Sequence, residues 1–175
     1  VALIGVLTVI LIYLLGKTWF SRGAGLLSAF LYAISPVNIN YSRFSWNPNP
    51  APFFALITIS GFYLSKKLSN YRWMILSGIG AAFAIQMHYL ALILLPLSLT
   101  LWFNAFFERL KGRHFWQGSI LAVLVFMLLM SPLLFFDLRH NFLNYKAISE
   151  FFFQSNANIG FNFFDILERI PQIYT

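Results

Sequence analysis

The chain has 175 residues, of which 59% are hydrophobic and only 10% charged, with a formal net charge of +7. A soluble domain carries about a quarter charged residues, so this composition excludes an ordinary soluble protein and predicts a polytopic membrane protein. The twelve basic residues lie in small groups between apolar runs, which indicates membrane topology and argues against a nucleic-acid partner. Because there is no cysteine, neither a disulfide nor a thiolate metal site is expected.

The first two apolar runs cover residues 1–16 and 23–37, and a basic loop at 17–22 separates them. A membrane-spanning helix needs roughly 20 mostly apolar residues. The sequence opens without an initiator methionine, a basic leader or a cleavage site, so it predicts a helix with its beginning cut off and no signal peptide.

The polar stretch SPVNINYSRFSWNPNPAPFF then interrupts the apolar pattern. The prolines at 48, 50 and 52 exclude a regular helix until the third apolar run, 51–65, begins. Asparagine amides can hydrogen-bond the backbone groups that are freed here, and the candidates are Asn38, Asn40, Asn47 and Asn49. The stretch is therefore predicted to be a rigid, hydrated loop.

Arg43 is the one formal charge in this loop and lies near Tyr41 and Trp46. A planar guanidinium is suited to bidentate binding of a phosphate. Arginine and aromatic residues are also common anchors at the lipid headgroups. Both interpretations of Arg43 stay open on the sequence alone.

The 35 apolar residues of 73–107 are too many for one span and about right for two. The polar cluster Gln86, Met87, His88, Tyr89 inside this run predicts a tight hairpin. An ionisable residue such as His88 at membrane depth is by default a site hypothesis, although at a hairpin tip it could simply touch water. Gln86 and Tyr89 are expected to anchor the turn.

The sixth run, 115–136, is followed directly by DLRH. In a helical continuation Asp137 would meet His140 and Asn141 at spacings of three and four, which predicts a structural ion pair or cap. The alternative is a ligand-binding role that includes Arg139. Further along, residues 162–174 place apolar and charged side chains on opposite helical faces, which predicts an amphipathic segment at the membrane surface.

The distribution of Lys and Arg predicts the topology. The loops at 17–22, 66–72 and 108–114 carry two, three and three such residues, while the alternate segments 38–49, 86–89 and 137–175 carry one, none and three. Short cytoplasmic loops are the ones enriched in Lys and Arg, so the alternate segments are expected on the non-cytoplasmic side. The three histidines are scattered and no HExxH motif is present, so a metal site within this chain has little support, the metal dependence stays open, and no other cofactor is expected.

Together SRFSWNPNP at 42–50, LSGIGAAFAIQMHYLALILLPLSL at 76–99 and DLRH at 137–140 resemble a known family. Over about residues 1–145 the chain is similar to the membrane region of the dolichyl-phosphate-mannose protein mannosyltransferase superfamily, the family 39 glycosyltransferases with the C-type fold, in its prokaryotic branch. The resemblance implies an integral membrane enzyme of cell-envelope glycosylation in the cytoplasmic membrane.

In this family a sugar moves from a polyprenyl phosphate to a lipid, glycan or protein acceptor on the non-cytoplasmic side. The resemblance implies that an aspartate in the first external loop is the general base, and that residue is expected upstream of Val1. Basic residues hold the departing phosphate, for which Arg43, His88 and Arg139 are available. Many relatives have an aspartate where this chain offers Asn47 or Asn49, and asparagine would bind or orient there because it cannot accept the proton.

The sequence thus predicts an all-α polytopic transmembrane helical bundle of about six spans over residues 1–136, followed by an extracytoplasmic segment, 137–175. A transporter or flippase subunit is the alternative, and a structural subunit without a site is a third. The absence of an internal repeat and the gathering of polar residues at one surface favour the enzyme. The predicted substrate-binding residues are Arg43, Trp46, Asn47, Asn49, His88, Tyr89, Asp137, Arg139 and His140.

Overall fold

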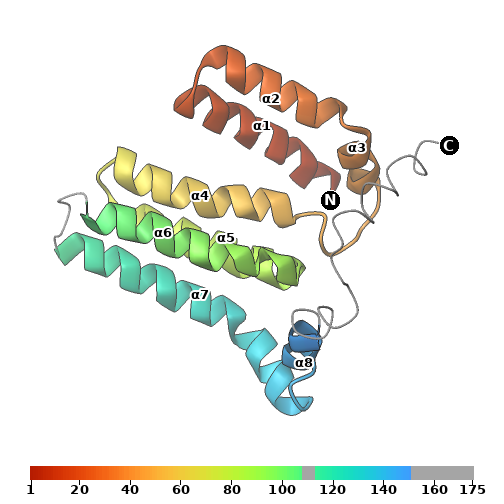
Figure 1. Ribbon diagram of the computed structural model, residues 1–175, viewed down its shortest axis with the longest axis vertical. Helices are drawn as coiled ribbons and strands as arrows, with labels where there is room; N and C mark the ends of the chain where they lie inside the picture. The colour runs from red at the N-terminus through yellow and green to blue at the C-terminus, as the bar shows by residue number, and fades with distance from the viewer. Residues whose placement is uncertain (108–112, 151–175) are drawn as a thin grey trace, which may run out of the picture. The chain divides into compact units, whose positions relative to one another are not determined.

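A computed structural model describes residues 1–107 and 113–150 (Figure 1). These residues form helices joined by turns, with no strand in the described ranges, which confirms the all-α prediction. The chain divides into two compact units, Val1–Pro132 and Leu133–Thr175. The predicted boundary after residue 136 lies four residues further along the same helix.

Helices α1 (Ala2–Trp19) and α2 (Arg22–Ile34) form an antiparallel pair. The pair is held close by two glycines, since a Cβ added to Gly16 would lie 2.8 Å from the Cα of Gly25. Ser21 caps α2 by accepting a hydrogen bond from the backbone N–H of Ala24 at 3.1 Å. The first helix therefore continues beyond the predicted run and leaves only a short turn.

The second predicted run does not form one helix. The residue before a proline favours extended backbone, and Ser35 is extended at φ −62° and ψ 120°. A new helix, α3 (Pro36–Arg43), begins at Pro36. The prediction of a loop from residue 38 onward was wrong for 38–43, because Pro36 both ends α2 and is favourable in the first turn of α3.

Helix α4 (Ala51–Lys67) lies at the centre of the first unit and contacts α1, α5 and α6. It runs antiparallel to α5 (Met74–Met87), which follows the 3-10 turn η1 (Tyr71–Trp73). The Ser77 hydroxyl of α5 donates to the Thr58 carbonyl of α4 at 2.8 Å. Figure 1 shows α4 beside α5 and α1 beside α2.

The long apolar run of 73–107 breaks at His88, as predicted. Helix α5 ends at Met87, His88 is extended at φ −157° and ψ 127°, and the chain resumes as a 3-10 helix, η2 (Tyr89–Ile93), that leads into α6 (Leu94–Phe107). The far end of α6 returns toward the start of α5, because Ser119 contacts both the Trp102 indole and the Met74 sulfur. The predicted hairpin is therefore confirmed.

Helix α7 (Arg113–Arg139) approaches α5 closely at Gly78, where an added Cβ would collide with the Ala122 carbonyl. The amide Nε2 of Gln86 donates to the Leu129 carbonyl at 3.1 Å, so Gln86 joins two helices in addition to standing next to the turn. Pro132 lies inside α7 and cannot donate to the carbonyl four residues before it. The Ser131 hydroxyl donates to that carbonyl, of Leu128, at 2.7 Å.

These contacts place the polar and basic segments at opposite ends of the first unit. Gly5, near the start of α1, approaches Ser42 at the end of α3. At the other end the Trp19 ring packs against Tyr63 with centroids 5.6 Å apart, close to the basic end of α4. The polar and basic segments, which alternate along the sequence, therefore lie at opposite ends of the first unit.

Within residues 1–107 and 113–150, three helical stretches are long and apolar enough to cross a membrane by length and composition: Ala2–Trp19, Tyr89–Phe107 and His114–Arg139. The helices α2, α4 and α5 are shorter, with 13, 17 and 14 residues. Helices thus make up most of every predicted apolar run, with breaks at Ser35 and His88, while the predicted count of about six spans stays a prediction.

The second unit contains the end of α7 and the short helix α8 (Leu143–Ser149). Phe142, which precedes α8, has a left-handed backbone with φ 58°, and this conformation reverses the chain after α7. The amphipathic segment predicted at 162–174 lies outside the described residues.

Candidate functional site

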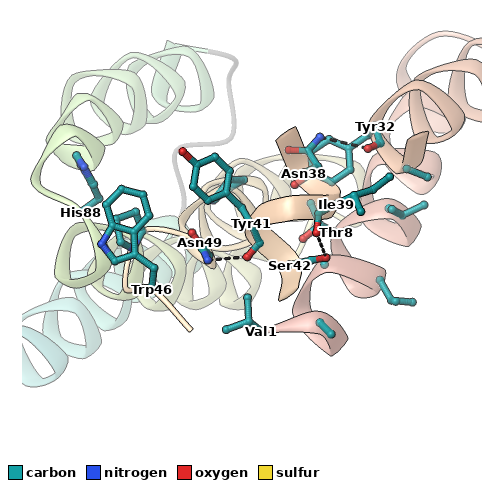
Figure 2. Close-up of a pocket in the computed structure, with 17 residues that line it drawn as sticks. Val1, Thr8, Tyr32, Asn38, Ile39, Tyr41, Ser42, Trp46, Asn49 and His88 are labelled. Carbon is teal, nitrogen blue, oxygen red and sulfur yellow. Dashed lines mark hydrogen bonds between the residues drawn. The ribbon is translucent and has the colours of Figure 1, made fainter. Parts of the chain in front are cut away.

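A pocket of about 570 Å³ opens at the polar end of the first unit (Figure 2). This volume is within the range of about 300–1,000 Å³ that small-molecule sites occupy. The start of α1, the end of α2, α3, the turn before α4 and the break after α5 all contribute to its wall. Its polar and aromatic lining residues are Thr8, Tyr32, Asn38, Tyr41, Ser42, Trp46, Asn49 and His88.

Two asparagines support the backbone around this pocket. The Asn38 amide donates to the Tyr32 carbonyl at 3.2 Å, the carbonyl that Pro36 leaves without its helical partner. The Asn49 amide donates to the carbonyls of Tyr41 at 2.6 Å and Phe44 at 3.0 Å, so it closes the end of α3. The prediction that asparagines hydrogen-bond freed backbone groups is confirmed for these two.

An aromatic pair borders the pocket. The rings of Tyr41 and Trp46 are stacked, with centroids 5.8 Å apart and planes inclined by 26°. Both remain partly open, with Tyr41 42% and Trp46 51% exposed. A flat aromatic surface with one polar edge suits contact with the apolar face of a sugar as well as with lipid headgroups.

His88 is the extended residue between α5 and η2, and its side chain lines the pocket. Its Nδ1 accepts a hydrogen bond from the backbone N–H of Leu90 at 3.1 Å, and its ring stacks on Tyr89 with centroids 4.8 Å apart. An imidazole that accepts at Nδ1 carries its proton on Nε2 in the neutral form. The ring nitrogen of His88 that can donate a hydrogen bond is therefore Nε2.

The opposite wall comes from α1 and α2. Thr8 is 2% exposed and donates to the Ile4 carbonyl at 2.7 Å, and Tyr32 of α2 lines the same wall. The rest of this wall is apolar, including Val6 and Val9. Figure 2 shows Thr8 and Tyr32 on one side of the pocket and Trp46 and His88 on the other.

The sequence of residues 1–136 matches the family described as dolichyl-phosphate-mannose-protein mannosyltransferase. The match covers more than three quarters of the chain. The chain belongs to this family. Comparisons with curated proteins and with solved structures find no match.

Family membership makes the chain part of an integral membrane glycosyltransferase of the mannosyltransferase type. The family implies a polyprenyl-phosphate-sugar donor and an acceptor in general. The pocket combines aromatic rings, amides, an imidazole and an apolar wall, a mixture of apolar lining and a few polar groups that is typical of small-molecule sites.

The structure brings three of the predicted site residues to the pocket, Trp46, Asn49 and His88. Arg43 ends α3 and is exposed beside the lining residue Ser42, and Asn47 is exposed in the following turn. Neither is a lining residue in this conformation. Tyr89 is half-buried and contacts the pocket wall through its stack on His88.

The remaining predicted residues belong to the second unit. The Asp137 carboxylate accepts hydrogen bonds from the backbone N–H groups of Asn144 at 2.8 Å and Tyr145 at 3.2 Å. It therefore caps α8 through partners other than the predicted His140 and Asn141. His140 stacks on Phe136 at 4.1 Å, and its Nδ1 lies 2.8 Å from the Phe136 carbonyl oxygen. Arg139 is exposed at the end of α7.

Sequence reasoning missed Thr8, Tyr32 and Ser42. Thr8 and Tyr32 lie inside apolar runs, where a single polar side chain is common in a helix and does not indicate a site. Their meeting depends on how α1 and α2 pack. The spacing of Gly5 and Thr8 could have indicated this wall, because residues three apart share one face of a helix, here the face of α1 that meets α2 and α3. Within the described ranges no group of three or more His, Cys, Asp or Glu side chains could hold a metal ion.

Proposed function

We propose that the pocket binds the sugar-phosphate end of a polyprenyl-phosphate donor and that the enzyme transfers the sugar to an acceptor hydroxyl on the non-cytoplasmic face. The observation that carries this proposal is the composition of the pocket wall, where the stacked pair Tyr41 and Trp46, the His88 imidazole and the apolar side of α1 face one volume. Each part of the wall suits a different part of the donor.

The reaction forms a bond between the acceptor oxygen and the anomeric carbon while the bond from that carbon to the phosphate oxygen breaks. The phosphate leaves with the electron pair and gains negative charge in a site with little water. Fixed N–H donors lower the energy of such a transition state by a few kcal/mol each. We assign this role to the Nε2 proton of His88, and to Arg43 after a side-chain movement from its exposed position beside Ser42.

The acceptor proton needs a base. None of the lining residues in the described part of the chain is a carboxylate, so the base is proposed to lie outside this set. The topology also belongs to the proposal. The basic segments at the far end of the first unit support a cytoplasmic position for that end, and the pocket would then face the opposite side.

The test uses the full-length protein in membranes with radiolabelled polyprenyl-phosphate sugars, and both sugar transfer and release of the lipid phosphate are measured. His88→Ala is expected to reduce turnover about 100-fold, the typical effect of losing one fixed donor. Arg43→Ala is expected to reduce it about tenfold. Arg22→Ala is the matched control, since Arg22 is an exposed cation at the other end of the unit.

Two outcomes contradict the proposal. Equal losses in Arg22→Ala and Arg43→Ala would point to a general effect of charge. A parent protein that transfers no sugar from several donors, yet moves lipid or solute across vesicles, would favour the transporter or flippase alternative.

A further inference from the structure

We propose that a second pocket, at the basic end of the first unit, binds the phosphate headgroup of an anionic membrane phospholipid. The pocket has a volume of about 710 Å³ and lies between the turn that precedes α5 and the start of α7. The turn contributes Ser69, Asn70, Tyr71 and Arg72, and α7 contributes His114, Gln117, Gly118, Ile120 and Leu121.

The polar wall of this pocket is suited to an anion. Arg72 and His114 are exposed, and a guanidinium and an imidazole are both effective phosphate donors. Gln117 adds a neutral amide from the same side of α7. None of the described lining residues is acidic, so nothing in the lining opposes a negative ligand.

The turn that precedes α5 is held in place by contacts within the protein, so its position does not depend on a bound ligand. Tyr71 is buried and its ring packs edge-on against Phe115 with centroids 5.1 Å apart. A Cβ on Gly118 would collide with the Tyr71 carbonyl, so the backbones of turn and helix approach closely. The Asn70 side chain accepts from the Arg72 N–H at 3.2 Å, which orients the residue that carries the charge.

The location favours a lipid over a soluble anion. His114 is the first residue of a candidate membrane span, His114–Arg139, and the first residue of a span lies at headgroup depth. About two turns further along α7, Ile120 and Leu121 are 55% and 42% exposed in the same pocket. A guanidinium and an imidazole at the rim, with apolar groups toward the bilayer, match a phosphate with its acyl chains.

The experiment measures lipid retention by native mass spectrometry of the delipidated full-length protein. Dioleoylphosphatidylglycerol is the probe, and dioleoylphosphatidylcholine has the same chains with a neutral headgroup. Glycerol phosphate and inorganic phosphate test for a soluble anion. We expect phosphatidylglycerol to bind at least tenfold more tightly than phosphatidylcholine, and Arg72→Gln to remove about that tenfold preference.

Two further variants control for loss of charge and loss of fold. Arg22→Gln removes an equivalent exposed charge from the same end of the unit and should keep the preference. Gln117→Leu keeps the charge and should weaken binding about threefold. Far-ultraviolet circular dichroism checks that each variant is folded. The proposal is overturned if Arg72→Gln binds like the parent, if Arg22→Gln loses as much, or if either soluble phosphate competes as effectively as the lipid.

Discussion

Two asparagine side chains in the polar segment donate hydrogen bonds to individual backbone carbonyl groups. Asn38 donates to the Tyr32 carbonyl, which Pro36 leaves without its usual helical donor, and Asn49 donates to two carbonyls at the end of α3. A buried or half-buried acceptor without a partner costs about 1–3 kcal/mol. The shape of the pocket therefore depends on residues whose side chains point at backbone as well as on those that face the cavity.

Asn49→Ala should lower the free energy of unfolding by about 1–2 kcal/mol, because two carbonyls lose their amide donor. The matched control is Asn47→Ala, since Asn47 is an exposed asparagine two residues away in the same turn. Thermal unfolding in detergent measures both variants. An equal loss of stability in the two would show that the hydrogen bonds from Asn49 do not hold α3.

Asp137→Ala should destabilise α8 locally by about 1 kcal/mol, the usual effect of losing an N-terminal cap. Hydrogen exchange of the amides of residues 143–149 reports the opening of this helix, and the Asn144 and Tyr145 amides should lose the most protection. Tyr145→Phe keeps the backbone donors and should leave exchange unchanged. Unaltered exchange in Asp137→Ala would rule out the cap.

Residue roles were predictable where a side chain has few chemical options. His88 stood out because it is ionisable within an apolar run, and it does line the pocket. The position of Arg43 was harder to predict, because its direction depends on the helical turn at which α3 ends. The partners of Asp137 lie seven and eight residues ahead, beyond the spacings of three and four that a continuous helix suggests.

Close helix packing in the first unit depends on glycine at particular positions of an element. A Cβ on Gly25 would lie 2.6 Å from the Lys17 nitrogen and 2.7 Å from the Tyr13 carbonyl oxygen. Two residues earlier in α2, a Cβ on Gly23 would meet only the Ser21 hydroxyl, at 3.9 Å. One glycine therefore sets the spacing of α1 and α2, and the other does not.

Gly25→Ala and Gly23→Ala should have effects of opposite sign. Alanine favours a helix over glycine by about 1 kcal/mol, so Gly23→Ala should raise the melting temperature. In Gly25→Ala the added methyl group separates α1 from α2, and overpacking of this kind costs about 1–3 kcal/mol. Differential scanning fluorimetry compares them. Stabilisation in both variants would mean that the helices can move apart without cost.

The elements themselves were predictable to different degrees. The break at His88 was signalled by a polar interruption of a run too long for one span. The break at Ser35 was not, because apolar residues continue through Val37 and hide the effect of Pro36. Hydrophobicity predicts which segments lie in the membrane. It does not predict where a helix ends, because a proline interrupts the backbone hydrogen bonds of the helix.

At the scale of the whole molecule, the polar segment and the basic segments should lie on opposite sides of the membrane. Ser45 and Leu68 are exposed at the two ends of the first unit, and the chain contains no cysteine. In a cysteine-free full-length background, Ser45→Cys should react with a membrane-impermeant maleimide in intact cells. Leu68→Cys should react only after the membrane is opened. Labelling of both from one side would contradict the predicted topology.

The short helices around the pocket should also affect the surrounding bilayer. At 1.5 Å per residue, the 13 residues of α2 and the 14 of α5 reach only about 20 Å, against a hydrocarbon core of about 30 Å. Such hydrophobic mismatch is relieved when the lipid thins next to the protein. Sugar transfer should therefore be faster in dimyristoyl than in dierucoyl phosphatidylcholine, because the thinner leaflet brings the headgroup region down to the level of the pocket.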